Sequence, residues 1–352
     1  MSETLYNQAI ARKNTSRPPV WFMRQAGRYH SHYQSMKLSH TFIELCKIPE
    51  LACEVTMGPI RDFNYDAAIL FSDLLFPLEV LGMGLDYVPG PKLDWHLKSV
   101  QDLSKLNPDH LNAKELVSGI AYQGKALNLI RKALPKEKSL LGFVGGPLTL
   151  FYYAAEGSHQ GSLHEAKAGL TDGRYDGFLK IVIPLLIENM SLQASSGADA
   201  VAVMDTCAGE VEPWLYRELV VPALREVLVG FRRRHPNTPV VYYSKGTGPT
   251  HWQHLEGLPF ECLGIDWNVP LKDALLNFGD RWAIQGNFDP HKMLLPEQAC
   301  KKEIEAFFEP ILKLPSEKLK GWVCGLGHGV LQWTPEQNVR QFLQYQKEVF
   351  PS

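Results

Sequence analysis

The sequence contains few cysteines, and none of them has metal-binding or redox spacing. Its six cysteines, at positions 46, 53, 207, 262, 300 and 324, are scattered, and no Cys-x-x-Cys pair occurs. This distribution excludes a zinc knuckle, a thioredoxin-type redox pair and a disulfide framework.

An excess of charge of either sign is missing too. With 36 Lys and Arg against 38 Asp and Glu, the formal net charge is −2, so no basic field attracts nucleic acid or an acidic membrane. The one local exception is the run Arg232-Arg233-Arg234-His235, where cations complement the end of an expected helix.

Long hydrophobic runs and a targeting segment are also lacking. No apolar stretch reaches the roughly 18 residues that would span a bilayer. The first residues, Met-Ser-Glu-Thr-Leu-Tyr-Asn, have no basic segment followed by an apolar one. We therefore expect a cytoplasmic protein without a membrane or nucleic-acid partner.

The remaining composition is that of a globular protein with a substantial core. Apolar residues make up 45% of the 352 residues and charged residues 21%. No low-complexity linker and no short repeat divides the chain, so we predict a single domain over residues 1–352.

Short apolar runs alternate with longer helical patterns along the whole chain. Several runs are continuously apolar, which is typical of parallel strands covered on both faces. The eight runs are 19–24, 67–72, 140–144, 200–205, 239–244, 263–267, 282–287 and 321–326. Eight alternations predict an α/β fold, a (β/α)8 TIM-type barrel. A doubly wound open sheet is retained as an alternative fold, although no glycine-rich phosphate loop follows the first run.

Several helix boundaries can be predicted between these runs. Apolar spacing indicates a helix over 212–234, and Gly197 is expected at the end of a helix before the fourth strand. Thr334 and Gln337 resemble a capping box for a final helix that extends to residue 350. The segment 74–91 is predicted to be a long loop that forms one wall of a cleft.

Polar side chains follow the ends of several predicted strands. They are Arg24 and Arg28, Asp73, Thr206, Lys245 and His328, with Gly145-Gly146-Pro147 after the third run. Because the active site of such a barrel lies at the carboxyl ends of its strands, we expect these groups to meet at one opening. Two arginines four residues apart can also bind carboxylates or phosphates.

The chain resembles the uroporphyrinogen decarboxylase family at motif after motif over nearly its whole length. The first motifs are Met-Arg-Gln-Ala-Gly-Arg-Tyr (23–29), Phe-Ser-Asp (71–73) and Gly-Met-Gly (82–84). Next come Gly-Phe-Val-Gly-Gly-Pro-Leu-Thr-Leu (142–150) and Asp-Thr-Cys-Ala-Gly (205–209). The series ends with Gly-Ile-Asp-Trp (264–267), Gln-Gly-Asn-Phe-Asp-Pro (285–290) and Gly-Leu-Gly-His-Gly (325–329).

This resemblance implies a reaction and a role for several residues. The reaction is removal of CO2 from four acetate side chains of uroporphyrinogen III, which gives coproporphyrinogen III in heme biosynthesis. Asp73 would accept hydrogen bonds from the pyrrole N–H groups and stabilise the ring cation. Arg24 and Arg28 would hold substrate carboxylates, and an Arg here is also a proposed proton donor. A simpler alternative for Asp73 is a helix cap.

Further residues match the family's substrate contacts. Tyr153, Thr206 and His328 would contact acetate and propionate arms, and Phe143 would supply an apolar wall. Tyr153 could equally be a core aromatic. The glycines beside His328 would let the backbone approach a ligand. The resemblance implies a homodimer, no metal and no cofactor, since a protonated pyrrole acts as its own electron sink.

The chain departs from the family pattern around the first and last motifs. The family often continues as Arg-Tyr-Leu-Pro-Glu-Tyr-Arg, whereas residues 30–34 here are His-Ser-His-Tyr-Gln, and Gly325 stands where Asn is common. Two charges are lost, and Lys37 is expected to take over part of the carboxylate binding. Affinity or preference among the four acetates is therefore expected to differ.

Two alternative functions remain. A corrinoid-dependent methyltransferase of the same superfamily activates a thiol through zinc, but none of the twelve histidines has a Cys two residues later. A non-catalytic tetrapyrrole-binding protein could keep the pocket without turnover.

Overall fold

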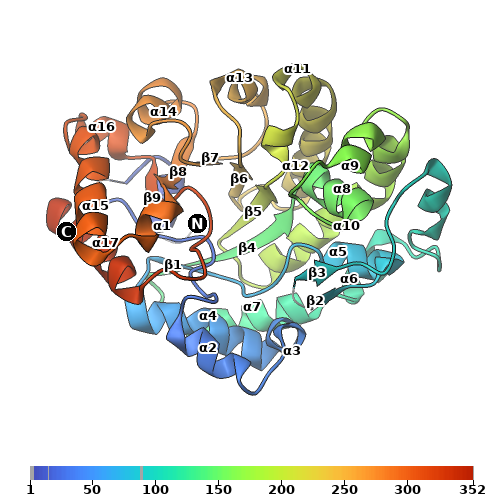
Figure 1. The fold of residues 1–352 in the computed structure, drawn as a ribbon, viewed down its shortest axis with the longest axis horizontal. Helices are drawn as coiled ribbons and strands as arrows, with labels where there is room; N and C mark the ends of the chain where they lie inside the picture. The colour runs from blue at the N-terminus through green and yellow to red at the C-terminus, as the bar shows by residue number, and fades with distance from the viewer. Residues whose placement is uncertain (1–3, 15, 88–89, 352) are drawn as a thin grey trace.

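The computed structural model of the protein describes residues 4–14, 16–87 and 90–351. Its centre is a sheet of seven parallel strands, in which each strand lies beside the next along the chain (Figure 1). In sheet order they are β1 (Ala67–Ile69), β4 (Ser139–Gly145), β5 (Ala200–Asp205), β6 (Val240–Ser244), β7 (Cys262–Ile265), β8 (Ala283–Phe288) and β9 (Trp322–Leu326). This order has no reversal point, so the doubly wound alternative is wrong.

The first predicted strand, 19–24, is not a regular strand. Only Val20 pairs, as an isolated parallel bridge to Cys324 of β9. The segment still lies between the two edges of the sheet, because Trp21 N donates to the Cys324 carbonyl at 3.1 Å and Asp66 N donates to the Val20 carbonyl at 3.0 Å. Pro19 has no N–H to donate, which limits the ladder that this segment can form. The observed fold is thus α/β with a curled seven-stranded parallel sheet.

Helices cover the outer side of the sheet, with the exception of α1, which packs inside the curl. The longer ones are α4 (Pro49–Phe63), α7 (Tyr122–Ala133), α8 (Pro147–Glu156), α10 (Arg174–Ser195), α12 (Val221–Arg234), α14 (Leu271–Phe278), α15 (Glu297–Leu312) and α17 (Glu336–Val349). The shorter ones are α1 (Leu5–Ile10), α2 (Ser31–Lys37), α3 (Phe42–Lys47), α5 (Phe76–Leu78), α6 (Ala113–Ser118), α9 (His164–Gly169), α11 (Pro213–Leu215), α13 (Pro249–Trp252) and α16 (Ser316–Leu319).

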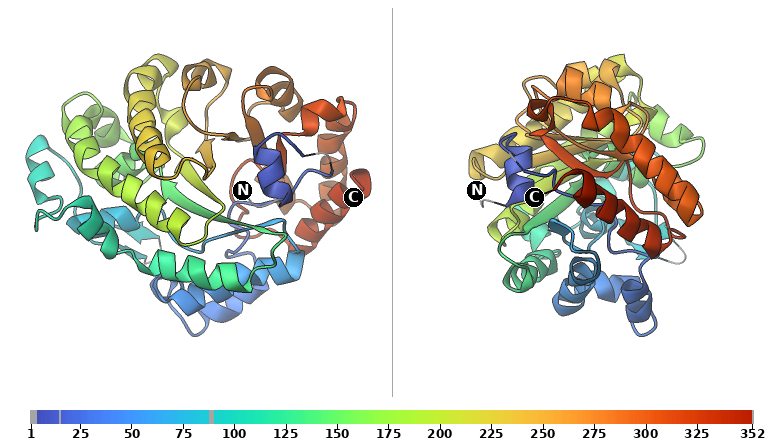
Figure 2. Two further views of the ribbon diagram at one scale, coloured as in Figure 1. Left: turned by 180° about the vertical axis from the view of Figure 1, so that it is seen from behind. Right: turned by 90° about the vertical axis from the view of Figure 1, so that its left-hand side faces the viewer.

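Alternate residues of the strands separate into two cores. One core packs the outer face of the sheet against the helices. The other fills the inside of the curl, where Val241 and Tyr243 of β6 meet Met204 of β5. Helix α1 belongs to this inner core, and its Tyr6 hydroxyl donates to Gln285 Oε1 at 3.0 Å. Seen from behind, α1 lies across the sheet, on the side opposite to that seen in Figure 1 (Figure 2).

The predicted helix over 212–234 is confirmed, with one irregular turn. It consists of α11, a π-helical turn at Tyr216–Val220 and α12. Gly197 also lies where it was predicted, after α10, with a φ of 103° that favours glycine.

The capping prediction for the last helix is wrong. Helix α17 begins at Glu336 with Pro335 as its N-cap, and the Thr334 hydroxyl has no hydrogen-bond partner among the described residues. The Glu336 carboxylate instead accepts a hydrogen bond from Ser31 N at 2.7 Å. A contact with α2, which is distant in sequence, therefore replaces the local capping box.

The segment 74–91 is more ordered than a simple loop. It contains α5, a π-helical turn at Glu79–Met83 and the strand β2 (Asp86–Tyr87). β2 pairs in antiparallel fashion with β3 (Pro91–Lys92). Phe76 and Met83 are fully buried, so this segment is anchored against the body of the protein.

Among the described residues, one helix is long and apolar enough to cross a membrane by length and composition alone. This is α10, whose mean hydropathy reaches 1.2, contrary to the expectation that no stretch qualifies. It contacts α12, β4 and β5, and its Phe178, Val182 and Leu186 are buried. Its apolar character is accounted for by packing under the sheet.

Candidate active site

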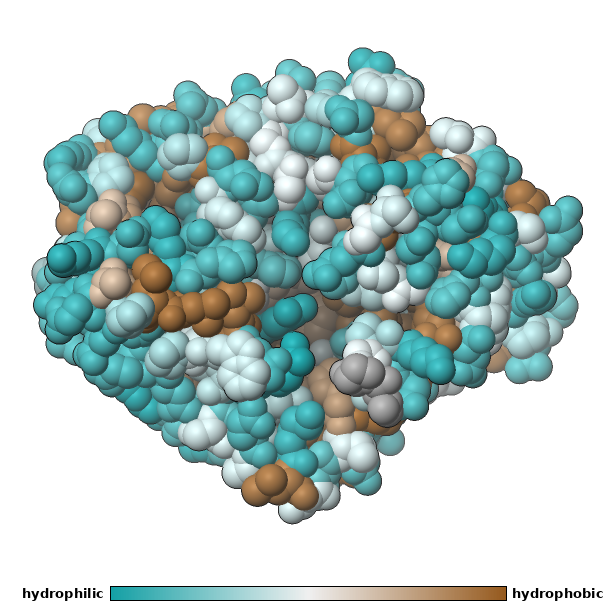
Figure 3. Space-filling model, viewed as in Figure 1, coloured by the Kyte–Doolittle hydropathy of each residue, from teal (hydrophilic) through white to brown (hydrophobic). Residues whose placement is uncertain are grey.

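The residues that follow the strands lie at one end of the curled sheet. The surface is hollowed near the middle of the face seen in Figure 3, and hydrophilic residues border the opening. Because all seven strands are parallel, their carboxyl ends face the same side and bring residues from distant parts of the chain together.

Asp73 lies beyond the end of β1 in a largely desolvated position. Its Oδ1 accepts a hydrogen bond from Leu75 N at 2.8 Å, which forms a local turn before α5. This bond is of the kind expected for a carboxylate that caps a turn, and the Tyr87 hydroxyl also acts on the Asp73 carboxyl group. Burial raises the pKa of Asp73, and the Leu75 amide, the Tyr87 hydroxyl and the Arg24 guanidinium offset part of that rise.

Arg24 comes from the segment that crosses between β9 and β1. It adopts a left-handed conformation with a φ of 58°, which turns the chain sharply at this point. The neighbouring Gln25 is buried and donates from Nε2 to the Ala67 carbonyl at 3.0 Å, which holds this turn against β1. The Arg24 charge lowers the pKa of both Asp73 and His328. Arg24 thus lies close to both groups, as the sequence predicted.

Arg28 and Lys37 are exposed, and no interaction given by the structure links either of them to Asp73. The Gln34 side chain, one of the departures from the family pattern, donates to the Arg28 carbonyl and so holds the backbone of this turn. Lys37 lies at the end of α2. All three side chains are exposed, and only the charge of Arg24 acts on Asp73 and His328.

His328 follows β9 and is held from one side by Tyr243 of β6. The Tyr243 hydroxyl lies 2.9 Å from the Gly327 carbonyl and 3.0 Å from His328 Nδ1, and the two rings stack with centroids 5.9 Å apart. Burial, followed by the charges of Arg24 and Lys245, lowers the pKa of His328 to about 3. The ring is therefore neutral at neutral pH.

The glycines around His328 lie close to neighbouring parts of the protein. A Cβ at Gly327 would lie 2.7 Å from the Trp267 backbone nitrogen, and a Cβ at Gly329 would lie 2.4 Å from Arg24 Cδ. These positions thus make room for protein neighbours, whereas the sequence suggested approach to a ligand. Gly325, another departure from the family, has the same cause: its Cβ would lie 2.3 Å from the Trp21 carbonyl oxygen.

Tyr153 of α8 is buried at the side of the cluster, and its hydroxyl bonds to His159 Nδ1. Burial raises the pKa of Tyr153, with a further rise from Asp73 and a small opposing effect of Arg24. Burial and the charges of Lys245 and Arg24 lower the pKa of His159. Tyr153 is thus both a packed aromatic and a member of the polar cluster.

Phe143 and Thr206 are half-buried at the ends of β4 and β5. Phe143 packs against the inner core, and its backbone is held by the Gln193 side chain, which accepts from Phe143 N at 2.6 Å. Thr206 is the first residue after β5 and lies in the turn that follows the strand. Both therefore line the same end of the curl as Asp73.

Three residues of the cluster were not assigned a role from the sequence. Lys245 follows β6 and was noted only for its position, whereas Tyr243 and His159 were missed. A tyrosine within an apolar strand and a histidine in a loop carry no local signal. The order of residues inside the strand could have identified Tyr243, because it precedes Lys245 by two residues on the same face.

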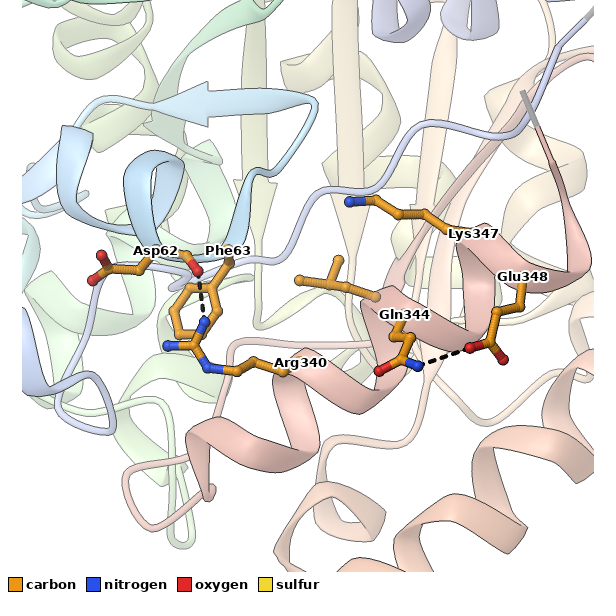
Figure 4. Close-up of a pocket in the computed structure, with 7 residues that line it drawn as sticks. Asp62, Phe63, Arg340, Gln344, Lys347 and Glu348 are labelled. Atoms are coloured by element: carbon orange, nitrogen blue, oxygen red, sulfur yellow. Dashed lines mark hydrogen bonds between the residues drawn. The ribbon is translucent and has the colours of Figure 1, made fainter.

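The described residues contain no group of three His, Cys, Asp or Glu that could hold a metal ion. A separate cavity of about 460 Å³ lies between α4 and α17 (Figure 4). Arg340 there stacks on Phe63 and donates to the Asp62 carbonyl at 2.7 Å, and Gln344 donates to Glu348 at 2.8 Å. Since these polar groups bind one another and none of the predicted site residues lines the cavity, it is not the candidate active site.

Solved structures share the fold over nearly the whole chain. A methyltransferase from Methanosarcina mazei superposes with a TM-score of 0.74 at 18% identity and covers 98% of each chain. A putative vitamin-B12 independent methionine synthase from Listeria monocytogenes superposes with a TM-score of 0.55 at 13% identity, covering 96% of this chain and 100% of that chain. At these identities the likeness shows the fold alone.

Sequence relatives are more informative. The uroporphyrinogen decarboxylase of Geobacter sulfurreducens is 34% identical over 331 residues, 93% of each chain. That of Pelobacter propionicus is 32% identical over 343 residues, 97% of each chain. The family model "Uroporphyrinogen decarboxylase (URO-D)" matches residues 1–349. The chain therefore belongs to the uroporphyrinogen decarboxylase family.

Proposed function

We propose that this protein is a carboxy-lyase that removes CO2 from the four acetate side chains of uroporphyrinogen III and yields coproporphyrinogen III. Membership of the family supports the reaction. The observation that carries it is the placement of Asp73, a half-buried carboxylate, near the Arg24 guanidinium, whose charge lowers the pKa of Asp73. Such a site fits a substrate with acidic arms around a ring of N–H donors.

Asp73 is the central group of this proposal. One of its oxygens is held by Leu75, which leaves the other oxygen for the pyrrole N–H groups of the macrocycle. Those donors would stabilise the ionised carboxylate in a position where burial raises its pKa. The resulting negative charge then faces the cation that forms when a pyrrole ring is protonated.

The atoms and electrons of each decarboxylation balance without a further reactant. A proton adds to a pyrrole carbon next to the acetate side chain, and the C–C bond to the carboxylate breaks. Its electron pair moves into the ring, CO2 leaves, and a second proton adds at the exocyclic carbon while the first is released. Each round thus converts –CH2–COO⁻ and one H⁺ into –CH3 and CO2. We assign no cofactor, because the protonated ring accepts the electrons.

The other predicted residues bind and orient the substrate. In the proposal, Arg24 and Arg28 hold carboxylates, Tyr153, Thr206 and His328 contact the arms, and Phe143 packs against the macrocycle face. Lys37 belongs to this set only if the exposed end of α2 turns toward bound substrate. Orientation of the acetate over the ring is the main contribution expected from these groups.

The test is an anaerobic incubation of the metal-free protein with uroporphyrinogen III, followed by oxidation and separation of the porphyrins by carboxylate number. Seven-, six-, five- and four-carboxylate products are expected without an added cofactor. Asp73→Asn should lower kcat/KM at least 100-fold, by loss of stabilisation of the ring cation. A persistent eight-carboxylate peak from folded wild-type protein would instead support the non-catalytic tetrapyrrole-binding protein.

We also propose that residues 19–22 close the seven-stranded sheet into an eight-membered TIM-type barrel within a single domain over 1–352. The hydrogen bonds of Trp21 to β9 and of Val20 to the residue before β1 support this closure. Hydrogen exchange tests it: the amides of Trp21 and Asp66 should be protected as strongly as those of β6.

A homodimer and a cytoplasmic location complete the proposal. Family resemblance supports the dimer, as do the exposed Trp333 and Trp214, which follow β9 and β5 at the same end of the sheet. Six free cysteines are consistent with a reducing compartment. Sedimentation equilibrium should give twice the chain mass, and Trp333→Ser should weaken the dimer.

A further inference from the structure

Lys245 is a cation at the edge of the cleft that the proposed chemistry does not use. It follows β6 directly and lies two residues after Tyr243, whose side chain belongs to the inner core. Because side chains alternate along a strand, Lys245 continues the inner face. Its charge acts on both His328 after β9 and His159 after α8, which places the ammonium group between two walls of the cleft.

The backbone around Lys245 is fixed from both neighbouring strands. Lys245 N donates to the Asp205 carbonyl at 3.3 Å, and Gly209 N donates to the Lys245 carbonyl at 2.9 Å. On the other side, Gly246 N donates to Asp266 Oδ2 at 2.6 Å. Gly246 has a φ of 74°, and its backbone would lie 2.5 Å from a Cβ at Gly209, so glycine is required at both positions. The backbone that carries the Lys245 side chain is thus fixed before a ligand arrives.

The ammonium group of Lys245 has no ion-paired carboxylate among the residues that the structure describes. Lys245 is half-buried, and within the described ranges 4–14, 16–87 and 90–351 no ion pair or hydrogen bond of its Nζ is found. The pKa values of the two imidazoles beside it are lowered, so both rings are neutral at neutral pH. Asp73 interacts with Arg24, and Asp266 accepts hydrogen bonds from Gly246 N and from Asn268. Arg24 and Lys245 therefore bring two cations to the same end of the sheet, and no ion pair of Lys245 is found among the described residues.

We propose that Lys245 is a substrate-binding residue that holds a carboxylate arm of the substrate on the β6 side of the cleft, away from the arm that reacts. The inference rests on the proposed function, because it needs a ligand with several carboxylates. A non-reacting arm is assigned because an ammonium ion paired with the reacting carboxylate would stabilise the ground state and oppose loss of CO2. Lys245 then binds the substrate and the transition state equally well. Its contribution therefore lowers KM and leaves kcat unchanged.

Lys245→Met tests this assignment, since it keeps the stem and removes the charge. Lys272→Met, an exposed lysine on α14, is the matched control. We expect Lys245→Met to raise KM for uroporphyrinogen and the Kd for the oxidised eight-carboxylate porphyrin about 10-fold to 100-fold, the effect of one hydrogen-bonded ion pair. The value of kcat should stay within about threefold of wild type, by the uniform-binding argument. Porphyrin binding is followed by tryptophan fluorescence at low and high salt.

Histidine NMR titration provides a readout that does not depend on substrate. Removal of the neighbouring charge should move the pKa of His328 upward in Lys245→Met and leave it unchanged in Lys272→Met. Unchanged porphyrin affinity in Lys245→Met, or a fall in kcat at constant KM, would overturn the inference. Wild-type protein that binds the porphyrin without turnover contradicts the proposed function alone, whereas wild-type protein that does not bind it contradicts both.

Discussion

The hydroxyl of Tyr243 contacts a carbonyl and an imidazole nitrogen, and this pair of contacts determines the tautomer of His328. The Gly327 carbonyl can only accept, so the Tyr243 proton points toward it. The Tyr243 oxygen must then accept from His328 Nδ1–H, since the imidazole is neutral. His328 therefore presents an unprotonated Nε2 on its other side. The hydrogen bonds of Tyr243 thus specify the tautomer of His328, which the position of His328 in the sequence motif does not.

Tyr243→Phe is expected to change this tautomer. The stacked ring remains, but His328 Nδ1 loses its acceptor and the Gly327 carbonyl loses its donor. The Nε2–H form should become populated, and the free energy of unfolding should fall by about 1–2 kcal/mol, the cost of an unsatisfied buried group. Long-range ¹⁵N–¹H NMR spectra report the tautomer directly.

Tyr175→Phe is the control for this variant, because Tyr175 is a buried tyrosine whose hydroxyl has no partner among the described residues. Its loss should leave both the tautomer and the stability nearly unchanged. Finding the Nε2–H form already in the wild-type protein would refute the assignment.

At the scale of elements, the contact between segment 19–22 and β9 holds the first part of the cleft. Gly325 lies in the middle of β9 and is paired on one side with Asn287 of β8. On its other side, a Cβ would lie 2.3 Å from the Trp21 carbonyl oxygen. Neither backbone can move away freely, because Gly325 is part of the β8–β9 ladder and Trp21 N is hydrogen-bonded to the Cys324 carbonyl. The absence of a side chain at position 325 thus permits the approach of the segment that carries Arg24.

Gly325→Ala should separate these two elements. We expect the free energy of unfolding to fall by about 1–3 kcal/mol, as for an overpacked core, and kcat/KM to fall because Arg24 is displaced. Gly248→Ala is the matched control, since its Cβ would meet only Val269 at 3.8 Å. Urea unfolding and steady-state kinetics of both variants measure these effects. Equal stability of Gly325→Ala and Gly248→Ala would contradict the expected clash with the Trp21 carbonyl.

At the scale of the whole molecule, burial makes several histidines poor bases. The pKa values of His30, His96, His159, His235 and His328 are all lowered, with desolvation as the largest cause in each case. For each of them the unfolded chain binds a proton more readily than the folded chain below about pH 6.5. Burial has the opposite effect on the pKa values of Asp73 and Asp205, which are raised, that of Asp205 to about 6.

The protein is therefore expected to lose stability as the pH falls from 7 to 5. In this window the five histidines favour the unfolded state, and the two raised carboxyl groups offset only part of the effect. Urea unfolding at pH 7 and pH 5 measures the difference. His328→Gln should show a smaller loss than wild type, because it removes the histidine whose pKa is lowered to about 3. A free energy of unfolding that rises toward pH 5 would be inconsistent with these shifts.

Much of the fold and part of the site could be predicted from local patterns. Continuous apolar runs located all seven strands of the central sheet, although not the short pair β2 and β3. Gly197 and the helix over 212–234 followed from backbone preference and helical spacing. The placement of Asp73, Arg24 and His328 near one another followed from the rule that parallel strands present their carboxyl ends together. These features depend on residues close together in the sequence or on the common direction of parallel strands. The amino-acid sequence by itself is therefore enough to determine them.

Tertiary structure decided what depends on residues far apart in the sequence. It reduced the strand predicted at 19–24 to a single bridge, and it replaced the cap at Thr334 by the contact of Glu336 with Ser31. It also brought His159 beside His328, and Tyr243 within hydrogen-bonding distance of it. Each outcome is set by distances between elements that meet only when the sheet curls. Local sequence patterns carry no information about such distances, whereas burial, charge and hydrogen-bond partners depend on them directly.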